Sequence, residues 1–139
     1  MTMQANALAG RMLDQGLAAF EATDIARRLA VGAPDNLASL RGFFGRVPQD
    51  VTAALLTRIA ADGPGVTEAD LGRLRVPTLV LGSAEDYIHP MAYAEALAGL
   101  IPGARLIEVP PKGRDRAAHV AACQNAILEF VEGLTHAEA

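Results

Sequence analysis

One stretch in the middle of the chain, residues 74–90 (LRVPTLVLGSAEDYIHP), limits most strongly what this sequence can fold into. Residues 76–82 form a short apolar run, rich in β-branched side chains, that ends at Gly82. Such a run is typical of a strand buried on both faces of a parallel sheet. Asp86 follows the carboxyl end of this strand, and Pro90 is suited to the first turn of a helix. Because open α/β sheets bind ligands beyond the carboxyl ends of their strands, the sequence predicts a candidate site at Asp86.

The second half of the chain alternates between strand and helix patterns. Asp115 is a suitable N-cap for the last helix. A right-handed crossover makes the two strands parallel and adjacent, so the loops after them are expected to open side by side at one edge of the sheet. The predicted order is strand, helix, strand, helix, at residues 76–82, 90–101, 104–110 and 115–133.

The apolar residues of the first half recur at helical spacing throughout, which predicts helices and no strands there. Gly32 and Pro34 are expected to end the second helix, and Asp35 or Asn36 to cap the third. Thr67 and Asp70 fit a capping-box variant at the start of a short helix that ends near Leu74. We therefore predict an α/β protein with a helical region at 1–72 and a βαβα region at 73–139. The longer helices are expected at 4–14, 17–31 and 48–61, the last of them burying Val51, Leu55, Leu56 and Ile59.

Residues 77–82, Asp86 and Pro90 resemble the penultimate strand and acid loop of an α/β-hydrolase. Residues 97–111 (LAGLIPGARLIEVPP) are similar to the helix, turn and last strand of that family, and residues 125–134 (NAILEFVEGL) to its closing helix. Residues 1–72 are similar, more weakly, to the helical cap of such enzymes. The resemblance implies a partial α/β-hydrolase fold and an ancestry in ester or acyl hydrolysis by nucleophile, histidine and acid. It makes Asp86 the acid.

The histidine of the family has no clear equivalent. Arg114 stands about where that histidine is expected, and arginine stays protonated and cannot serve as a base. It could form a salt bridge with Asp86 in place of a catalytic contact. His119 lies one turn into the last helix and could reach back to the site, or it is an ordinary helical histidine. His89 is too close in sequence to Asp86 to be the usual base, and an Asp86–His89 metal site would lack further ligands.

Other residues near the candidate site offer no nucleophile. No Gly-x-Ser-x-Gly elbow occurs, and neither Ser39 nor Ser83 follows a strand in that context. Cys123 lies on the apolar face of the last helix and is expected in the core. Glu85 is expected to be solvated. The predicted catalytic set is therefore Asp86 and His119 alone, with no metal or cofactor.

The sequence thus predicts a hydrolase-like fragment that is inactive by itself; the alternative is a binding or oligomerisation module derived from a hydrolase. Two strands make a poor sheet, so we expect cap helices, a second copy or a complementing chain to cover the open sheet edge. A small apolar ligand in the cap groove is a further expectation.

Composition narrows the class of protein. The chain has 139 residues, of which 51% are hydrophobic and 20% charged, enough for a globular core. A net charge of −4, without a basic block or any tryptophan, argues against nucleic acid as a partner. The single cysteine cannot form an intrachain disulfide. Because we find neither a signal peptide nor an apolar run of membrane-spanning length, we expect a cytoplasmic protein without membrane contact.

Overall fold

A computed structural model describes residues 3–137 of the chain, with side chains up to residue 135. The structure mixes helix and sheet and is mostly helical, at 62%. It consists of two compact units, Met1–Gly65 and Val66–Ala139, so the division lies at 65/66, several residues before the predicted 72/73. Two parallel strands follow a helical first part, as expected, although the structure does not contain a full α/β-hydrolase fold.

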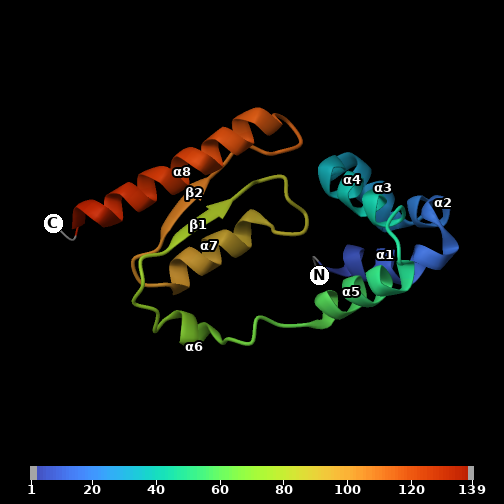
Figure 1. Cartoon of the computed structure of the whole chain (residues 1–139), viewed down its shortest axis with the longest axis horizontal. Coiled ribbons are helices and arrows are strands. Elements are labelled where there is room, and N and C mark those ends of the chain that lie inside the picture. Colours follow the sequence, from blue (N-terminus) through green and yellow to red (C-terminus); the bar gives the residue numbers. More distant parts are fainter. Residues whose placement is uncertain (1–2, 138–139) are drawn as a thin grey trace. The chain divides into compact units, whose positions relative to one another are not determined.

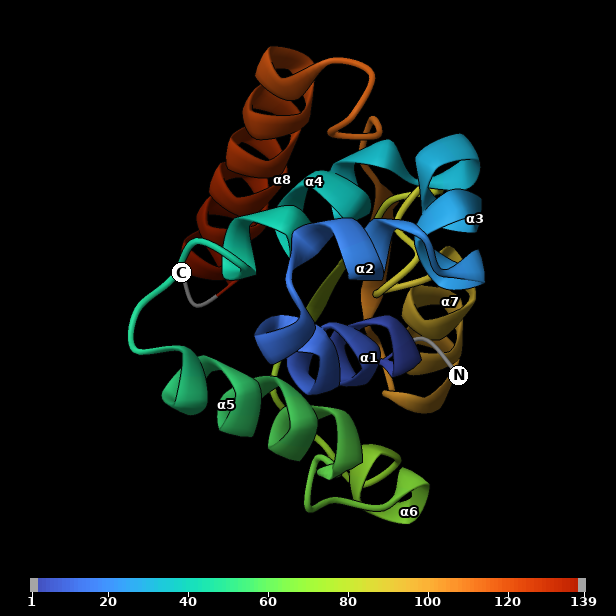
Figure 2. The same ribbon diagram turned by 90° about the vertical axis from the view of Figure 1, so that its right-hand side faces the viewer.

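Unit 1 is built of helices alone (Figures 1 and 2). Its core holds mainly alanine, leucine and phenylalanine side chains, including the fully buried Phe20, Leu29 and Leu40. Helix α1 lies against α5, and a Cβ added at Gly10 would stand 2.9 Å from the Leu56 Cβ. The elements of this unit are α1 (Gln4–Met12), a 3₁₀ turn η1 (Leu13–Gln15), α2 (Leu17–Glu21), α3 (Asp24–Gly32), α4 (Pro34–Phe43) and α5 (Gln49–Ala61).

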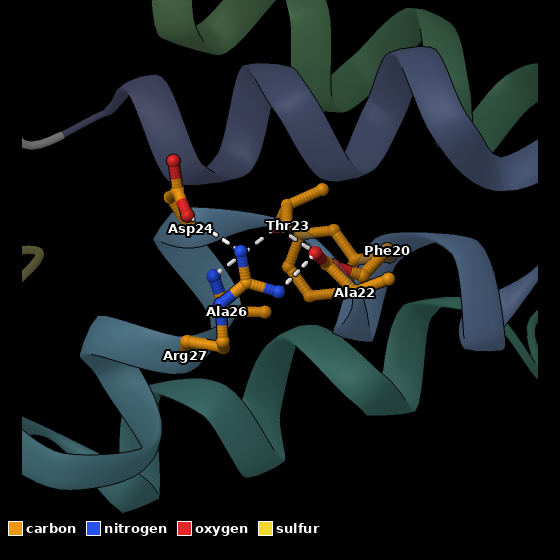
Figure 3. Close-up of polar contacts among 6 residues, drawn as sticks. All are labelled: Phe20, Ala22, Thr23, Asp24, Ala26 and Arg27. Carbon is orange, nitrogen blue, oxygen red and sulfur yellow. Dashed lines mark hydrogen bonds and ion pairs between the residues drawn. The ribbon is translucent and has the colours of Figure 1, made fainter.

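The helix predicted over 17–31 is interrupted at Thr23. The Thr23 hydroxyl donates to the Phe20 carbonyl at 2.7 Å and accepts the Ala26 N–H at 3.2 Å, which ends α2 and caps α3 (Figure 3). Arg27 reinforces the corner by donating to the Ala22 carbonyl and to Asp24 (Figure 3). Apolar spacing continues through this corner, so spacing alone could not reveal the break.

The second predicted helix ends at Gly32 as expected, and Pro34 then begins α4, because a first-turn residue has no need of its N–H. The N-cap of α4 is Ala33, and not Asp35 or Asn36 as predicted. On α5 only Leu56 of the four expected residues is buried. Val51, Leu55 and Ile59 remain 58%, 49% and 48% exposed, which leaves an apolar row at helical spacing on the surface.

Unit 2 contains the predicted strands and the helices between and after them. The strands are parallel and adjacent, with Leu79 opposite Arg105 and Gly82 opposite Glu108. Helices α7 and α8 lie on opposite sides of this small sheet (Figures 1 and 2). The first strand is shorter than predicted: it begins at Leu79, and residues 76–78 precede it without regular structure. The elements are α6 (Glu68–Leu71), β1 (Leu79–Gly82), α7 (Met91–Leu100), β2 (Arg105–Glu108) and α8 (Arg116–Ala137).

Two predicted caps of unit 2 are confirmed. Thr67 and Asp70 exchange side-chain-to-backbone hydrogen bonds as a capping box at α6. The Asp115 carboxylate accepts the Ala118 N–H at 2.9 Å at the start of α8. Among residues 3–137, no helix combines the length and the apolar character needed to cross a membrane.

Candidate functional site

The loops that follow β1 and β2 meet at the carboxyl edge of the sheet. The Arg114 guanidinium, in the loop after β2, forms an ion pair with the Glu85 carboxylate in the loop after β1. Side-by-side opening of the two loops, predicted from the crossover, is therefore confirmed. The partner of Arg114 is Glu85, which was expected to be solvated, and not the neighbouring Asp86. This contact raises the pKa of Arg114 above its ordinary value, so the side chain stays a cation and cannot act as a base.

Asp86 holds its own loop together. Its Oδ1 accepts the backbone N–H of Ile88 at 2.8 Å and that of His89 at 2.9 Å. Its Oδ2 lies 3.1 Å from the His89 Nδ1. The His89 side chain is 80% exposed, whereas that of Asp86 is 32% exposed. The imidazole beside the predicted acid is thus His89, which sequence distance had argued against; a tight loop brings the two side chains together three residues apart.

His119 is oriented away from this pair. Its Nδ1 lies 2.8 Å from the Pro110 carbonyl oxygen, and its Nε2 lies 3.8 Å from the Cys123 Sγ. Both ring nitrogens therefore have partners other than Asp86, and the predicted Asp86–His119 set is not assembled. Instead, the Asp86 carboxylate contacts His89 within the loop after β1, and the Pro110 carbonyl contacts His119 in the first turn of α8.

Cys123 is a residue whose surroundings the sequence reasoning missed. It was expected in the core, but it is partly accessible and lies within reach of an imidazole. The sequence could have predicted the neighbouring imidazole, because residues four apart on a helix are neighbours on its surface and His119 precedes Cys123 by four.

The charged and polar groups at the sheet edge do not form a metal centre. Throughout the part of the chain that the structure describes, no three histidine, cysteine or acidic side chains gather closely enough to hold a metal ion.

One hollow of unit 1 is a shallow, open depression lined by Asp24, Arg27, Arg28, Val31 and Gly32. Ligand pockets usually enclose most of their ligand, and three of the five lining residues here are charged. Two of them already pair, with the Arg27 Nη2 at 2.6 Å from the Asp24 Oδ1 (Figure 3). The small apolar ligand therefore stays a prediction.

The comparisons with known proteins give no further guide. No protein-family model matches this chain, and no solved structure matches it either.

Proposed function

We propose that this protein is derived from an α/β-hydrolase and does not hydrolyse esters by itself. The support is the order of elements in unit 2: a short strand, an acid loop, a helix, a parallel neighbouring strand and a long closing helix. Only alternate residues of the first strand, Val80 and Gly82, are buried, and not both faces as predicted. In the family that the sequence resembles, the acid and the histidine come from the two loops that meet at this edge. The proposal thus explains why acidic and basic side chains converge there.

The Glu85–Arg114 ion pair is the main observation that supports the proposed lack of ester hydrolysis. It joins the two loops across the edge where an acid and an imidazole would have to meet. A guanidinium cannot take a proton from a nucleophile. The Asp86 Oδ1, in turn, is occupied by two backbone N–H groups. His89 contacts the Asp86 Oδ2 from within the same loop, whereas the loop after β2 supplies Arg114 and no histidine. Because the sequence also lacks the serine elbow, neither the second-loop base nor the hydroxyl nucleophile of the family mechanism is in place.

The test is steady-state hydrolysis of a short activated ester, p-nitrophenyl acetate, by the purified full chain. We expect the rate after the first equivalent of product to equal that of buffer. Asp86→Asn, which keeps the shape of the side chain but removes its charge, should behave as the parent does. Saturable multiple turnover that disappears in Asp86→Asn would show that the edge is a working catalytic centre.

A second candidate function is self-association, and the small sheet favours it. Among the described residues the sheet has two strands only. The Thr78 and Gly82 carbonyls accept from Arg105 and Val109, so Leu79 and Leu81, which alternate with them, direct their backbone groups away from β2. Such an edge is a template for pairing with another chain.

Self-association predicts a mass in solution twice the 14.5 kDa of one chain. Leu79→Pro removes an outward-facing N–H and is expected to lower the dimer population, since proline is tolerated on a strand edge. Val80→Pro removes an inward-facing N–H and should instead unfold the sheet, which circular dichroism would detect. A monomer at all accessible concentrations, measured by light scattering after size exclusion, rejects this candidate.

A further inference from the structure

The chain contains a single Asp–Gly pair, Asp62 and Gly63, which the sheet edge and the proposed function do not involve. Asp62 is the C-cap of α5, and Gly63 follows it shortly before the boundary between the two units. All residues from 61 to 69 are exposed. An aspartate followed by glycine can close into a ring, because glycine has no side chain to keep its nitrogen away from the neighbouring carboxyl group.

The structure brings the two reacting groups of this pair together. The Asp62 N–H donates to the Arg58 and Ile59 carbonyl oxygens at 2.9 and 3.3 Å, which holds its main chain at the end of α5. The Gly63 N–H instead donates to the Asp62 carboxylate, with its nitrogen 3.0 Å from Oδ1. A rotation of the Asp62 side chain is then enough to bring its carboxyl carbon onto this nitrogen. Groups held about 3–3.5 Å apart in one molecule react far faster than the same groups free in solution.

Three aspartates of unit 2 make different hydrogen bonds. The carboxylates of Asp70, Asp86 and Asp115 accept N–H groups that lie two or three residues away. These hydrogen bonds hold each carboxyl group away from the nitrogen of the following residue, which in each case carries a large side chain. Asp62 is therefore distinguished by its hydrogen bond as well as by its neighbour.

We propose that Asp62 and Gly63 form a modification site at which the folded chain converts aspartate to isoaspartate. The Gly63 nitrogen bonds to the side-chain carboxyl carbon of Asp62, and the hydroxyl of the protonated carboxyl group leaves with the proton of the nitrogen as one water molecule. The product is a succinimide ring. A second water then gives its hydroxyl to the main-chain carbonyl carbon of Asp62 and its proton to the nitrogen, and the bond between that carbon and the nitrogen breaks. No oxidant or further reactant is needed.

Isoaspartate changes the segment before the unit boundary but leaves the contacts inside each unit in place. The main chain then runs through the side chain of Asp62, so it gains one carbon atom there, and the free carboxylate moves to the α-carbon. The Asp62 N–H keeps its acceptors at the end of α5. We therefore expect the modified chain to keep the circular dichroism and the urea midpoint of the parent. The inference is independent of the proposed lack of ester hydrolysis, which concerns Asp86 and the sheet edge.

The experiment incubates the full chain for weeks at neutral pH in water enriched in the heavy oxygen isotope. Samples are then digested in ordinary water with a protease that cuts before aspartate but not before isoaspartate. Mass spectrometry should show a progressive loss of the cut before residue 62, and the uncut peptide should carry heavy oxygen from the opening of the ring. The cuts before the other aspartates should persist. A cut before residue 62 that also persists would overturn the proposal.

Two variants separate the local geometry from the dipeptide alone. Gly63→Val crowds the attacking nitrogen, and it fits the fold because a Cβ at Gly63 would meet nothing within 4 Å. It should slow the loss of the cut by about tenfold or more, since intramolecular attack depends steeply on the approach of the two atoms.

Val51→Gly places a glycine after Asp50, in the first turn of α5, where helical geometry fixes the main chain. The cut before residue 50 should persist in this variant, while the cut before residue 62 is lost as in the parent. Equal losses at the two positions, or an unchanged loss in Gly63→Val, would contradict the proposed site.

Discussion

At the scale of single residues, Asp86 matters because it holds the loop after β1 in shape. Its carboxylate accepts two backbone N–H groups and contacts His89. We expect Asp86→Ala to lower the free energy of unfolding by about 1 kcal/mol, the usual cost of losing a capping side chain. Asp86→Asn retains an acceptor oxygen and should cost less than half as much. Urea unfolding measures both, and equal losses would contradict this role.

Asp70 gives unit 2 a pH-dependent contact. The Thr67 hydroxyl, the Thr67 N–H and Arg73 all hydrogen-bond the Asp70 carboxylate and hold its pKa below the ordinary 3.8. Because the folded-state pKa lies below the unfolded one, the stabilisation is complete above the unfolded pKa. It is lost as the pH falls through the folded-state value.

The carboxyl carbon resonance of Asp70, followed by NMR from neutral pH to pH 2, measures this pKa. Its value in variants tests which hydrogen bond lowers the pKa most. Thr67→Ala should raise the pKa of Asp70 more than Arg73→Ala does, because the hydroxyl is the largest contributor. A larger rise in Arg73→Ala would show that charge and not hydrogen bonding dominates.

Sequence reasoning succeeded at this scale where the contact is local. The Thr67–Asp70 box and the Asp115 cap depend on neighbours within three residues, so their patterns are visible in the chain. It failed to choose between Glu85 and Asp86 as the partner of Arg114. Adjacent side chains point in different directions, and the irregular backbone of residues 83–90 decides which one faces the other loop.

At the scale of elements, the contact of β1 with α7 depends on the absence of a side chain at Gly82. A Cβ there would stand 2.8 Å from the Ala94 Cβ and 2.5 Å from the Met91 Sδ. The thioether can move, but the alanine is fixed to its helix. Gly82→Ala is therefore expected to destabilise the protein by about 1–3 kcal/mol, as overpacking commonly does.

Gly99 provides a control substitution on α7, the helix that Gly82 contacts. A Cβ at Gly99 would meet nothing within 4 Å, and alanine favours a helix over glycine by up to about 1 kcal/mol. Gly99→Ala should thus be neutral or stabilising in the same thermal or urea unfolding measurement. If the two substitutions shifted stability equally, the close approach at Gly82 would not be the cause.

The element predictions show what periodicity can and cannot supply. It located most of the helices and both strands, because apolar spacing differs between the two. It could not tell that Thr23 breaks a helix whose apolar pattern runs on. Nor could it tell which apolar row of α5 is buried: Leu56 faces the core, whereas Leu55, one residue earlier, lies about a quarter-turn away on the surface.

At the scale of the whole molecule, the chain is divided near residue 65 into two units. Residues 61–69 are exposed and mostly without regular structure, and such segments are preferred sites of proteolytic cleavage. Limited digestion with a protease that cuts before aspartate should therefore cleave first at Asp62. Mass spectrometry of the early products identifies the site. A first cut at Asp86, in the hydrogen-bonded loop of the sheet edge, would contradict the expected order.

The overall α/β character and the adjacency of the strands could be predicted because crossover handedness leaves few topologies for strand, helix, strand. The boundary between the two units was predicted less accurately than the adjacency of the strands. The α6 capping box lies between the helical and βαβα patterns, and its sequence does not say which side it joins.

The outward-facing backbone of β1 has a practical consequence for anyone who produces this protein. Half of the hydrogen-bonding groups of that strand face away from β2, so we expect association of the protein through this edge to increase with concentration. We expect a peptide that carries a matching extended segment to pair with the same edge.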